Sequence, residues 1–220
     1  KGKFYPEGSP LHNMETVEMR FMTAKEEDIL TSQSLIRKGI VIDRLLQSLI
    51  VDKRIALEQL LIGDKNALVV AARISGYGNE YETRVSCPSC DNTVEFMFDL
   101  DEIHIKEFEE DEDLMVSLTS NNTFSVELPK SRATVEVKPL TGADERFIAQ
   151  QSERRKKNKL ADNALTTQLK RMICSVNGDE DEGIISKFVD SLPAFDSRFL
   201  RGTYASFVPD IDMKQDFTCS

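Results

Sequence analysis

The sequence is poor in the residues that most often carry enzyme chemistry. Its 220 residues include no tryptophan and only two histidines, His12 and His104. A Ser/His/Asp or Cys/His mechanism therefore has few candidate bases. The phosphate-binding pattern G-x-x-x-x-G-K-[ST] does not occur either. We find no convincing active site in the sequence, and we expect a protein that is not an enzyme.

Positive charge and long apolar runs are also scarce. Lys and Arg total 28 against 38 for Asp and Glu, which gives a net charge of −10. Such an acidic chain disfavours non-specific binding to nucleic acid or to an anionic membrane. The longest apolar-rich windows, residues 40–51 and 67–74, are too short for a membrane span. The chain begins without an initiator Met or a secretory signal and ends inside a motif. We therefore expect the printed residues to be less than the whole gene product.

The hydrophobic pattern of the first 80 residues is mainly helical. Alternation predicts a strand over 17–22, and the capping-box pattern Thr23…Glu26 starts a helix that we expect to run to Arg37. Further helices are predicted over 40–51 and 65–74. The second of these is apolar nearly all round, so we expect it to be buried.

The pattern then changes to short strands and back to helices. Strands are predicted on both sides of a C-P-S-C turn, over 81–86 and 93–100, and again over 115–120, 123–129 and 133–140. Helices are predicted over 141–159, 161–176, 184–193 and 197–207, and an extended end over 208–220. This order indicates an α+β fold.

Four cysteines occur, and three of them form a suggestive pattern. The turn "ETRVSCPSC" places Cys87 and Cys90 at C-x-x-C spacing, and the chain's end, "DFTCS", repeats the start of that motif at Cys219. Two thiolates on one turn can face one metal, and structural zinc then needs two further ligands in a tetrahedron. We predict a structural zinc ion held by these three cysteines and a fourth ligand beyond Ser220.

That zinc site would divide the chain into four parts. They are an N-terminal strand and helical unit over 1–80, the first half of a zinc-ribbon-like hairpin over 81–106, an inserted strand and helix region over 107–208, and a returning strand with a truncated second half-knuckle over 209–220. The predicted fold is thus α+β with split zinc-ribbon-like β hairpins.

Other interpretations of these cysteines stay open. His104 is an alternative ligand, although a surface histidine beside acidic residues has no need of a metal. Cys174 lies on the apolar face of the predicted helix 161–176, where a buried thiol is common. The pair Cys87 and Cys90 can also exist without metal. Thioredoxin-like redox catalysis is disfavoured, because a strand pattern and not a helix follows Cys90.

Longer stretches resemble a known family. They are "FMTAKEEDILTSQSLIRKGIVIDRLLQSLI", "LLIGDKNALVVAARISGYGNEYETRVSCPSC" and "FDL". They are similar to the baseplate hub subunits and hub assembly proteins of T4-like contractile-tailed bacteriophages, most clearly from about Met19 to Leu100. The end resembles the family's "F-x-C-x-x-C-G" segment, cut before its second cysteine. The resemblance implies a structural or assembly role and no enzymatic activity.

The same resemblance implies the protein's partners and location. It predicts contacts with other phage tail baseplate proteins, in the host cytoplasm during assembly, and leaves open whether the protein stays in the virion. A transient assembly chaperone is one alternative. A zinc-ribbon regulator that binds nucleic acid is another, but only Arg84 is basic between Tyr81 and Leu100. The basic run 154–159 lacks interleaved aromatic residues and favours a solvated helix end. The sequence does not indicate the oligomeric state.

Overall fold

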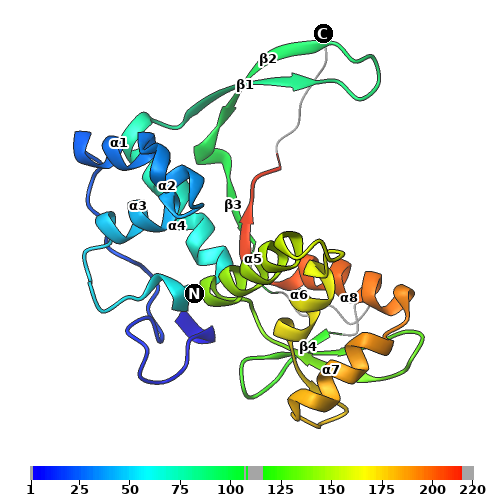
Figure 1. Cartoon of the computed structure of the whole chain (residues 1–220). Helices are drawn as coiled ribbons and strands as arrows, with labels where there is room; N and C mark the ends of the chain where they lie inside the picture. Colours follow the sequence, from blue (N-terminus) through cyan, green and yellow to red (C-terminus); the bar gives the residue numbers. More distant parts are fainter. Residues whose placement is uncertain (1, 107, 109–115, 215–220) are drawn as a thin grey trace. The chain divides into compact units, whose positions relative to one another are not determined.

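The chain folds into two compact units that each combine distant segments. The computed structural model describes residues 2–106, 108 and 116–214. Unit 1 comprises Lys1–Thr16, Glu58–Ile62 and Glu107–Pro209, and unit 2 comprises Val17–Leu57, Gly63–Lys106 and Asp210–Ser220. Figure 1 traces their helices and strands along the chain. Short antiparallel sheets accompany helices in both, so the prediction of an α+β fold is confirmed. Among the described residues, no helix is long and apolar enough to cross a membrane.

Four helices form the first part of unit 2: α1 (Ala24–Thr31), α2 (Gln33–Arg37), α3 (Val41–Leu49) and α4, which runs from Ile62 to Tyr77. Leu45, Leu49 and Ala72 form its small buried cluster, against which methionine, isoleucine and leucine side chains of residues 19–30 pack. The amphipathic pattern of α3 is the reason, because its leucines recur on one face and bury it.

A buried carboxylate joins three segments of this unit. Glu26 is fully buried and accepts hydrogen bonds from the Thr23 backbone N–H (3.0 Å), the Thr23 hydroxyl (2.6 Å) and the Ser48 hydroxyl (2.6 Å). Arg20 lies 3.5 Å from the same carboxylate. The predicted capping pair at the start of α1 is thus confirmed, and it also binds α3 through Ser48. These hydrogen bonds, that from Ser48 first, lower the pKa of Glu26 to about 2.

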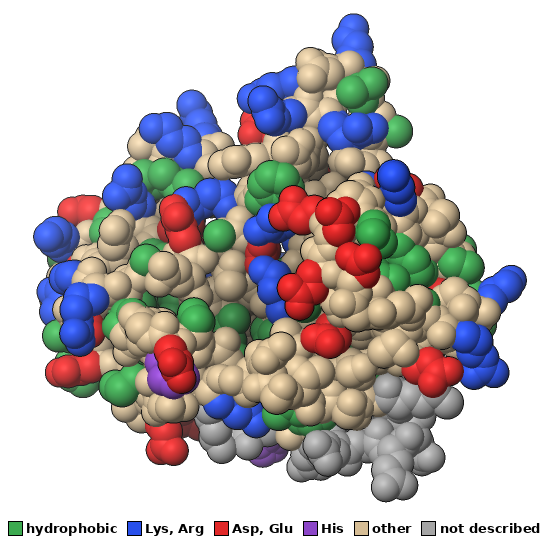
Figure 2. Space-filling view, turned by 90° about the horizontal axis from the view of Figure 1, so that it is seen from below, with side chains coloured by type: hydrophobic (Ala, Val, Ile, Leu, Met, Phe, Trp, Pro, Cys, Tyr) green, Lys and Arg blue, Asp and Glu red, His purple; other side chains and the backbone are tan. Residues whose placement is uncertain are grey.

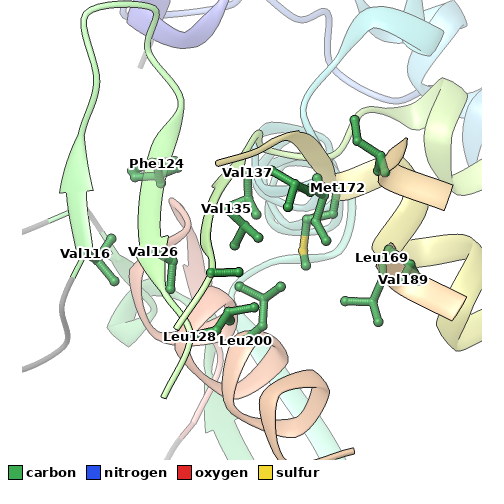
Figure 3. Close-up of a cluster of buried hydrophobic side chains, with 14 of the residues drawn as sticks. Val116, Phe124, Val126, Leu128, Val135, Val137, Leu169, Met172, Val189 and Leu200 are labelled. Atoms are coloured by element: carbon green, nitrogen blue, oxygen red, sulfur yellow. The ribbon is translucent and has the colours of Figure 1, made fainter. Parts of the chain in front are cut away.

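Unit 1 is built on a four-stranded antiparallel sheet in the order β4-β5-β6-β7. The strands are β4 (Val116–Leu118), β5 (Phe124–Glu127), β6 (Thr134–Val137) and β7 (Ile173–Val176). The helices that follow or interrupt them are α5 (Gly142–Lys157), α6 (Ala164–Met172), α7 (Glu182–Ser191) and α8 (Ala194–Phe207). Inward-facing residues of the strands, among them Phe124, Val126, Val135 and Val137, are fully buried with Met172 and Leu200 from the helices (Figure 3).

Four sequence predictions need correction. Residues 17–22 form no strand but a single bridge, Met19 to Ile50, because the segment that faces them is the short end of α3. The helix expected over 24–37 is interrupted at Ser32, where the backbone is extended (ψ 104°). A serine hydroxyl competes with the helix for hydrogen bonds to nearby backbone groups, which disfavours serine inside a helix. The helix expected to start at Lys65 begins at Ile62. It buries only Leu68 and Ala72 and is not buried all round.

The fourth correction concerns the helix predicted over 161–176. Helix α6 ends at Met172, and Ile173–Val176 continue as strand β7. This strand pairs with β6, with a register irregularity between Glu136 and Val137. Ile173 and Val176, at the two ends of this stretch, are β-branched and favour a strand. Strand β6 supplies hydrogen-bond partners for their backbone, and the helical periodicity of the sequence could not predict those partners.

Candidate functional site

The C-P-S-C motif lies at the tip of a long hairpin in unit 2. Strand β1 (Glu80–Ser86) pairs antiparallel with β2 (Thr93–Asp99) in seven successive pairs, from Glu80 opposite Asp99 to Ser86 opposite Thr93. The two predicted strands are therefore confirmed. Among the described residues, these two strands form a sheet of their own. A sheet of two strands is marginally stable by itself.

The hairpin has two chemically different faces. Because directly opposed residues of an antiparallel pair lie on the same face, we define the apolar face as Tyr81, Thr83, Val85, Val94, Phe96 and Phe98. The Phe96 and Phe98 rings meet edge to face at 4.8 Å between centroids. The other face is mostly charged and polar, with Glu80, Glu82, Arg84, Glu95 and Asp99.

The turn at the tip is held by backbone hydrogen bonds. The Cys87 N–H donates to the Asn92 carbonyl, and the Asp91 N–H donates to the Cys87 carbonyl, each at 2.9 Å. Asp91 adopts a left-handed conformation (φ 56°), which an aspartate tolerates better than most residues. Cys87 is buried and Cys90 is exposed. The turn therefore places two thiols of different accessibility on one short connection.

The chemistry of these donors fits one half of a structural zinc site. Paired thiolates on a turn between strands are the ligands that zinc prefers. Within the described residues, however, no group of three or more His, Cys, Asp or Glu is arranged to hold a metal. Cys219 lies outside the described residues. Cys87 and Cys90 therefore account for half of a tetrahedral donor set, and the complete site stays a prediction.

The other two candidate ligands lie on other elements. His104 begins β3 (His104–Lys106) and stands opposite Asp212 of β8 (Asp210–Asp212). Cys174 lies on β7, where its thiol donates to the Glu136 carbonyl at 3.4 Å. Burial, and the nearby Glu136 carboxylate, raise the pKa of Cys174 to about 11. A thiol held in its protonated form is a poor nucleophile and metal ligand.

A polar cleft of about 650 Å³ in unit 1 was not predicted from the sequence. Glu136, Lys138 and Arg171 line it, together with the exposed ring of Phe147. Its cations are already engaged, because Asp144 lies 3.1 Å from the Lys138 ammonium and 2.6 Å from the Arg171 guanidinium. The cleft lining contains no histidine among the described residues.

Sequence reasoning also missed an arginine–tyrosine cluster at the base of the hairpin. The Arg73 guanidinium lies 5.3 Å from the centre of the Tyr77 ring and 5.9 Å from that of Tyr81. It also donates to the backbone carbonyls of Gly78 (2.7 Å) and Glu80 (3.0 Å). Arg73 and Tyr77 are four residues apart on α4, and this spacing would have predicted a contact between their side chains. Tyr81 joins them only because the chain turns back at Gly78 (φ 81°).

Comparison with known proteins relates the chain to a protein family. The sequence model of the family described as T4 bacteriophage base plate protein matches residues 8–123, which is more than half of the chain and includes the whole hairpin. No curated protein and no solved structure matches the chain.

Proposed function

Because the chain belongs to the T4 bacteriophage base plate protein family, we propose that it acts in the hub of the phage baseplate. In this role it is a subunit or assembly factor that works through contacts with other baseplate proteins. It meets them in the host cytoplasm during assembly and, if it is a subunit, also in the virion tail. The observation that carries the proposal is the family match over residues 8–123.

Exposed apolar side chains on both units support a role in protein contacts. Phe21 is 78% exposed and Ile105 is 73% exposed in unit 2, and Phe195 is 62% exposed in unit 1. On the face drawn in Figure 2, small groups of hydrophobic side chains lie among interspersed acidic and basic ones. Large apolar side chains rimmed by polar residues are typical of surfaces that other proteins cover.

A nonsense mutation in the gene of the encoding phage tests this function. We expect infected cells to accumulate incomplete baseplates, visible by electron microscopy, and the intact gene supplied on a plasmid to restore tails. Mass spectrometry of purified tails then separates a subunit, which stays in the particle, from a chaperone, which leaves it. Normal baseplates in the mutant would refute the proposed function.

We also propose that Cys87, Cys90 and Cys219 hold a structural zinc ion. The hairpin turn and the marginal stability of a two-stranded sheet support this proposal. A metal at the tip would tie the hairpin to the end of the chain, and structural zinc stabilises small domains by about 10 kcal/mol or more.

Native mass spectrometry of the whole gene product tests the zinc proposal. We expect one zinc ion per chain, lost in Cys87→Ser and Cys219→Ser. The matched control is Cys174→Ser, which changes a thiol outside the proposed site and should keep the metal. Zinc-free protein, or full zinc retention in both variants, would rule out this site.

A further inference from the structure

We propose that the exposed face of helix α8 in unit 1 is a docking site for a helix of another baseplate protein, one whose apolar row is flanked by aspartate or glutamate. The inference rests on the proposed function and adds to it the surface, its geometry and the chemistry of the partner. We define the docking groove by its lining residues, which are Phe195, Arg198, Phe199, Gly202, Thr203 and Ser206.

Helix α8 uses one of its faces for the core of unit 1 and leaves another uncovered. Its buried residues recur every three or four positions, as at Asp196, Leu200, Thr203 and Phe207. Phe195 lies outside this buried row, and its ring is 62% exposed. Aromatic residues and arginine are enriched in the cores of protein interfaces. The uncovered face therefore carries an anchor that the core of this chain does not use.

The groove has the shape that a second helix requires. Residues four apart form rows on a helix surface, and the rows of one helix pack into the grooves of another. Phe195 and Phe199 form an aromatic row, and Gly202 and Ser206 form a row of small side chains beside it. The hollow measures about 500 Å³, and all of its lining residues belong to α8. A hollow on one helix covers its occupant from one side only, whereas a small molecule is usually enclosed on most of its surface.

Gly202 is the part of the groove that the packing of this chain does not explain. Glycine in the interior of a helix is less favourable than alanine. A Cβ atom added at Gly202 would nevertheless meet no atom within 4 Å outside the adjoining helix backbone. The missing side chain leaves room for another backbone to approach closely. Ser206 can be covered as well, because its hydroxyl already donates to the Thr203 carbonyl at 2.7 Å.

The charge of the groove specifies the partner. Arg198 lines the groove, and Arg201 lies one turn further along the same flank of α8. Neither has an ion pair within the described part of the chain. Asp196, the one acidic residue of α8, is fully buried and accepts hydrogen bonds from the Lys130 and Ser131 backbone N–H groups. The exposed charge on α8 is therefore positive, and carboxylates beside the apolar row of a partner helix would pair with it.

The same features argue against two other occupants. A second copy docked through the same groove would bring two more arginines and no exposed carboxylate of α8, and like charges across an interface are unfavourable. Nucleic acid needs many cationic contacts to its phosphates, whereas this face offers two arginines on a chain with a net charge of −10. An acidic protein helix therefore fits the groove better than either.

Site-specific photo-crosslinking in infected cells tests this proposal. We place benzoylphenylalanine at Phe195 in the plasmid copy that rescues the nonsense phage, and we identify the crosslinked peptide by mass spectrometry. We expect a peptide of another baseplate protein, with Asp or Glu three or four residues from the crosslinked position, as neighbours on a helix surface are. Gly202→Leu fills the groove and Arg198→Glu reverses its charge. Each should lower the crosslink yield about tenfold or more, because packing at the centre and charge at the rim control association.

Matched variants separate loss of docking from loss of folding. Ala143→Leu adds bulk at an exposed position of α5, and Arg154→Glu reverses an exposed cation near the end of the same helix. Both should leave the crosslink yield unchanged. The open space at Gly202 predicts that Gly202→Leu folds, so melting curves of the purified full chain should show a Tm no lower than that of the wild type.

Three results would overturn the proposal. They are a Phe195 crosslink to a second copy, to nucleic acid or to a segment without acidic residues, the absence of any crosslink, and an unchanged yield in either folded groove variant. In each of these cases the phenotype of the nonsense mutant still decides the proposed function independently.

Discussion

Replacing Asp196 by alanine should destabilise unit 1 more than any surface change of the same kind. Asp196 is fully buried in the first turn of α8 and accepts hydrogen bonds from the backbone N–H groups of Lys130 (2.9 Å) and Ser131 (2.8 Å). It thereby fixes α8 to the turn between β5 and β6. Burial alone would raise the pKa of this carboxyl, but the hydrogen bonds from Ser131 and Lys130 outweigh it and lower the pKa.

The size of the effect follows from the two amides. When a backbone N–H that is shielded from water loses its hydrogen-bond partner, the free energy of unfolding falls by about 1–3 kcal/mol. Both amides are only partly buried, so we expect a total loss of about 2–4 kcal/mol in the free energy of unfolding. For a unit of this size that corresponds to a fall in Tm of about 10 °C. Asp196→Asn should fall between the wild type and Asp196→Ala, because its side-chain oxygen can still accept one hydrogen bond.

Urea unfolding and differential scanning calorimetry of the full chain measure this loss. The matched control is Asp190→Ala, which removes an exposed partner of Lys170 (2.7 Å). Exposed ion pairs contribute about 0–1 kcal/mol, so this control should barely change the urea midpoint. Equal effects of Asp190→Ala and Asp196→Ala would show that the buried carboxylate does not fasten α8 to the sheet, and would refute the reasoning.

Three further predictions concern both units. The pKa of Glu26 in the folded chain lies below that of the unfolded carboxyl, so its contribution to stability is complete above about pH 4.5 and is lost as the pH falls towards 2. Ser48→Ala should therefore lower the free energy of unfolding by about 2 kcal/mol at pH 7 and by progressively less below pH 4. Urea unfolding at a series of pH values measures this difference. Phe124→Ala should cost about 3–5 kcal/mol, because the ring is fully buried among other aromatic rings, and a loss below 1 kcal/mol in urea unfolding would contradict this packing. In chelator, iodoacetamide should alkylate Cys174 about tenfold more slowly than Cys90, since a pKa near 11 leaves little thiolate, and equal rates by mass spectrometry would disprove the shift.

Local patterns predicted the elements whose structure depends on neighbouring residues. The capping residues at the start of α1 and α5, the leucine face of α3 and the alternating strands around the C-P-S-C turn all involve contacts within a few positions. The α+β class follows from their order. The position of Cys87 and Cys90 on a turn between two strands could also be predicted, because such a turn depends only on neighbouring residues.

Features that depend on distant contacts could not be predicted in this way. The stretch Ile173–Val176 became a strand because β6 offers hydrogen-bond partners, although its own pattern continues a helix. Asp196 looks like an ordinary acidic residue until α8 meets the turn between β5 and β6. Glu26 was recognised as a capping residue, but its hydrogen bond from Ser48 exists only because α1 meets α3.

The β1–β2 hairpin and the arginine–tyrosine cluster at its base show the same division. The sequence by itself determined the two faces of the hairpin, because alternation along a strand assigns each side chain to one side. Only the tertiary structure decided that Arg73 stands between Tyr77 and Tyr81. That contact requires the chain to reverse at Gly78, and a reversal brings together residues whose spacing carries no periodic signal.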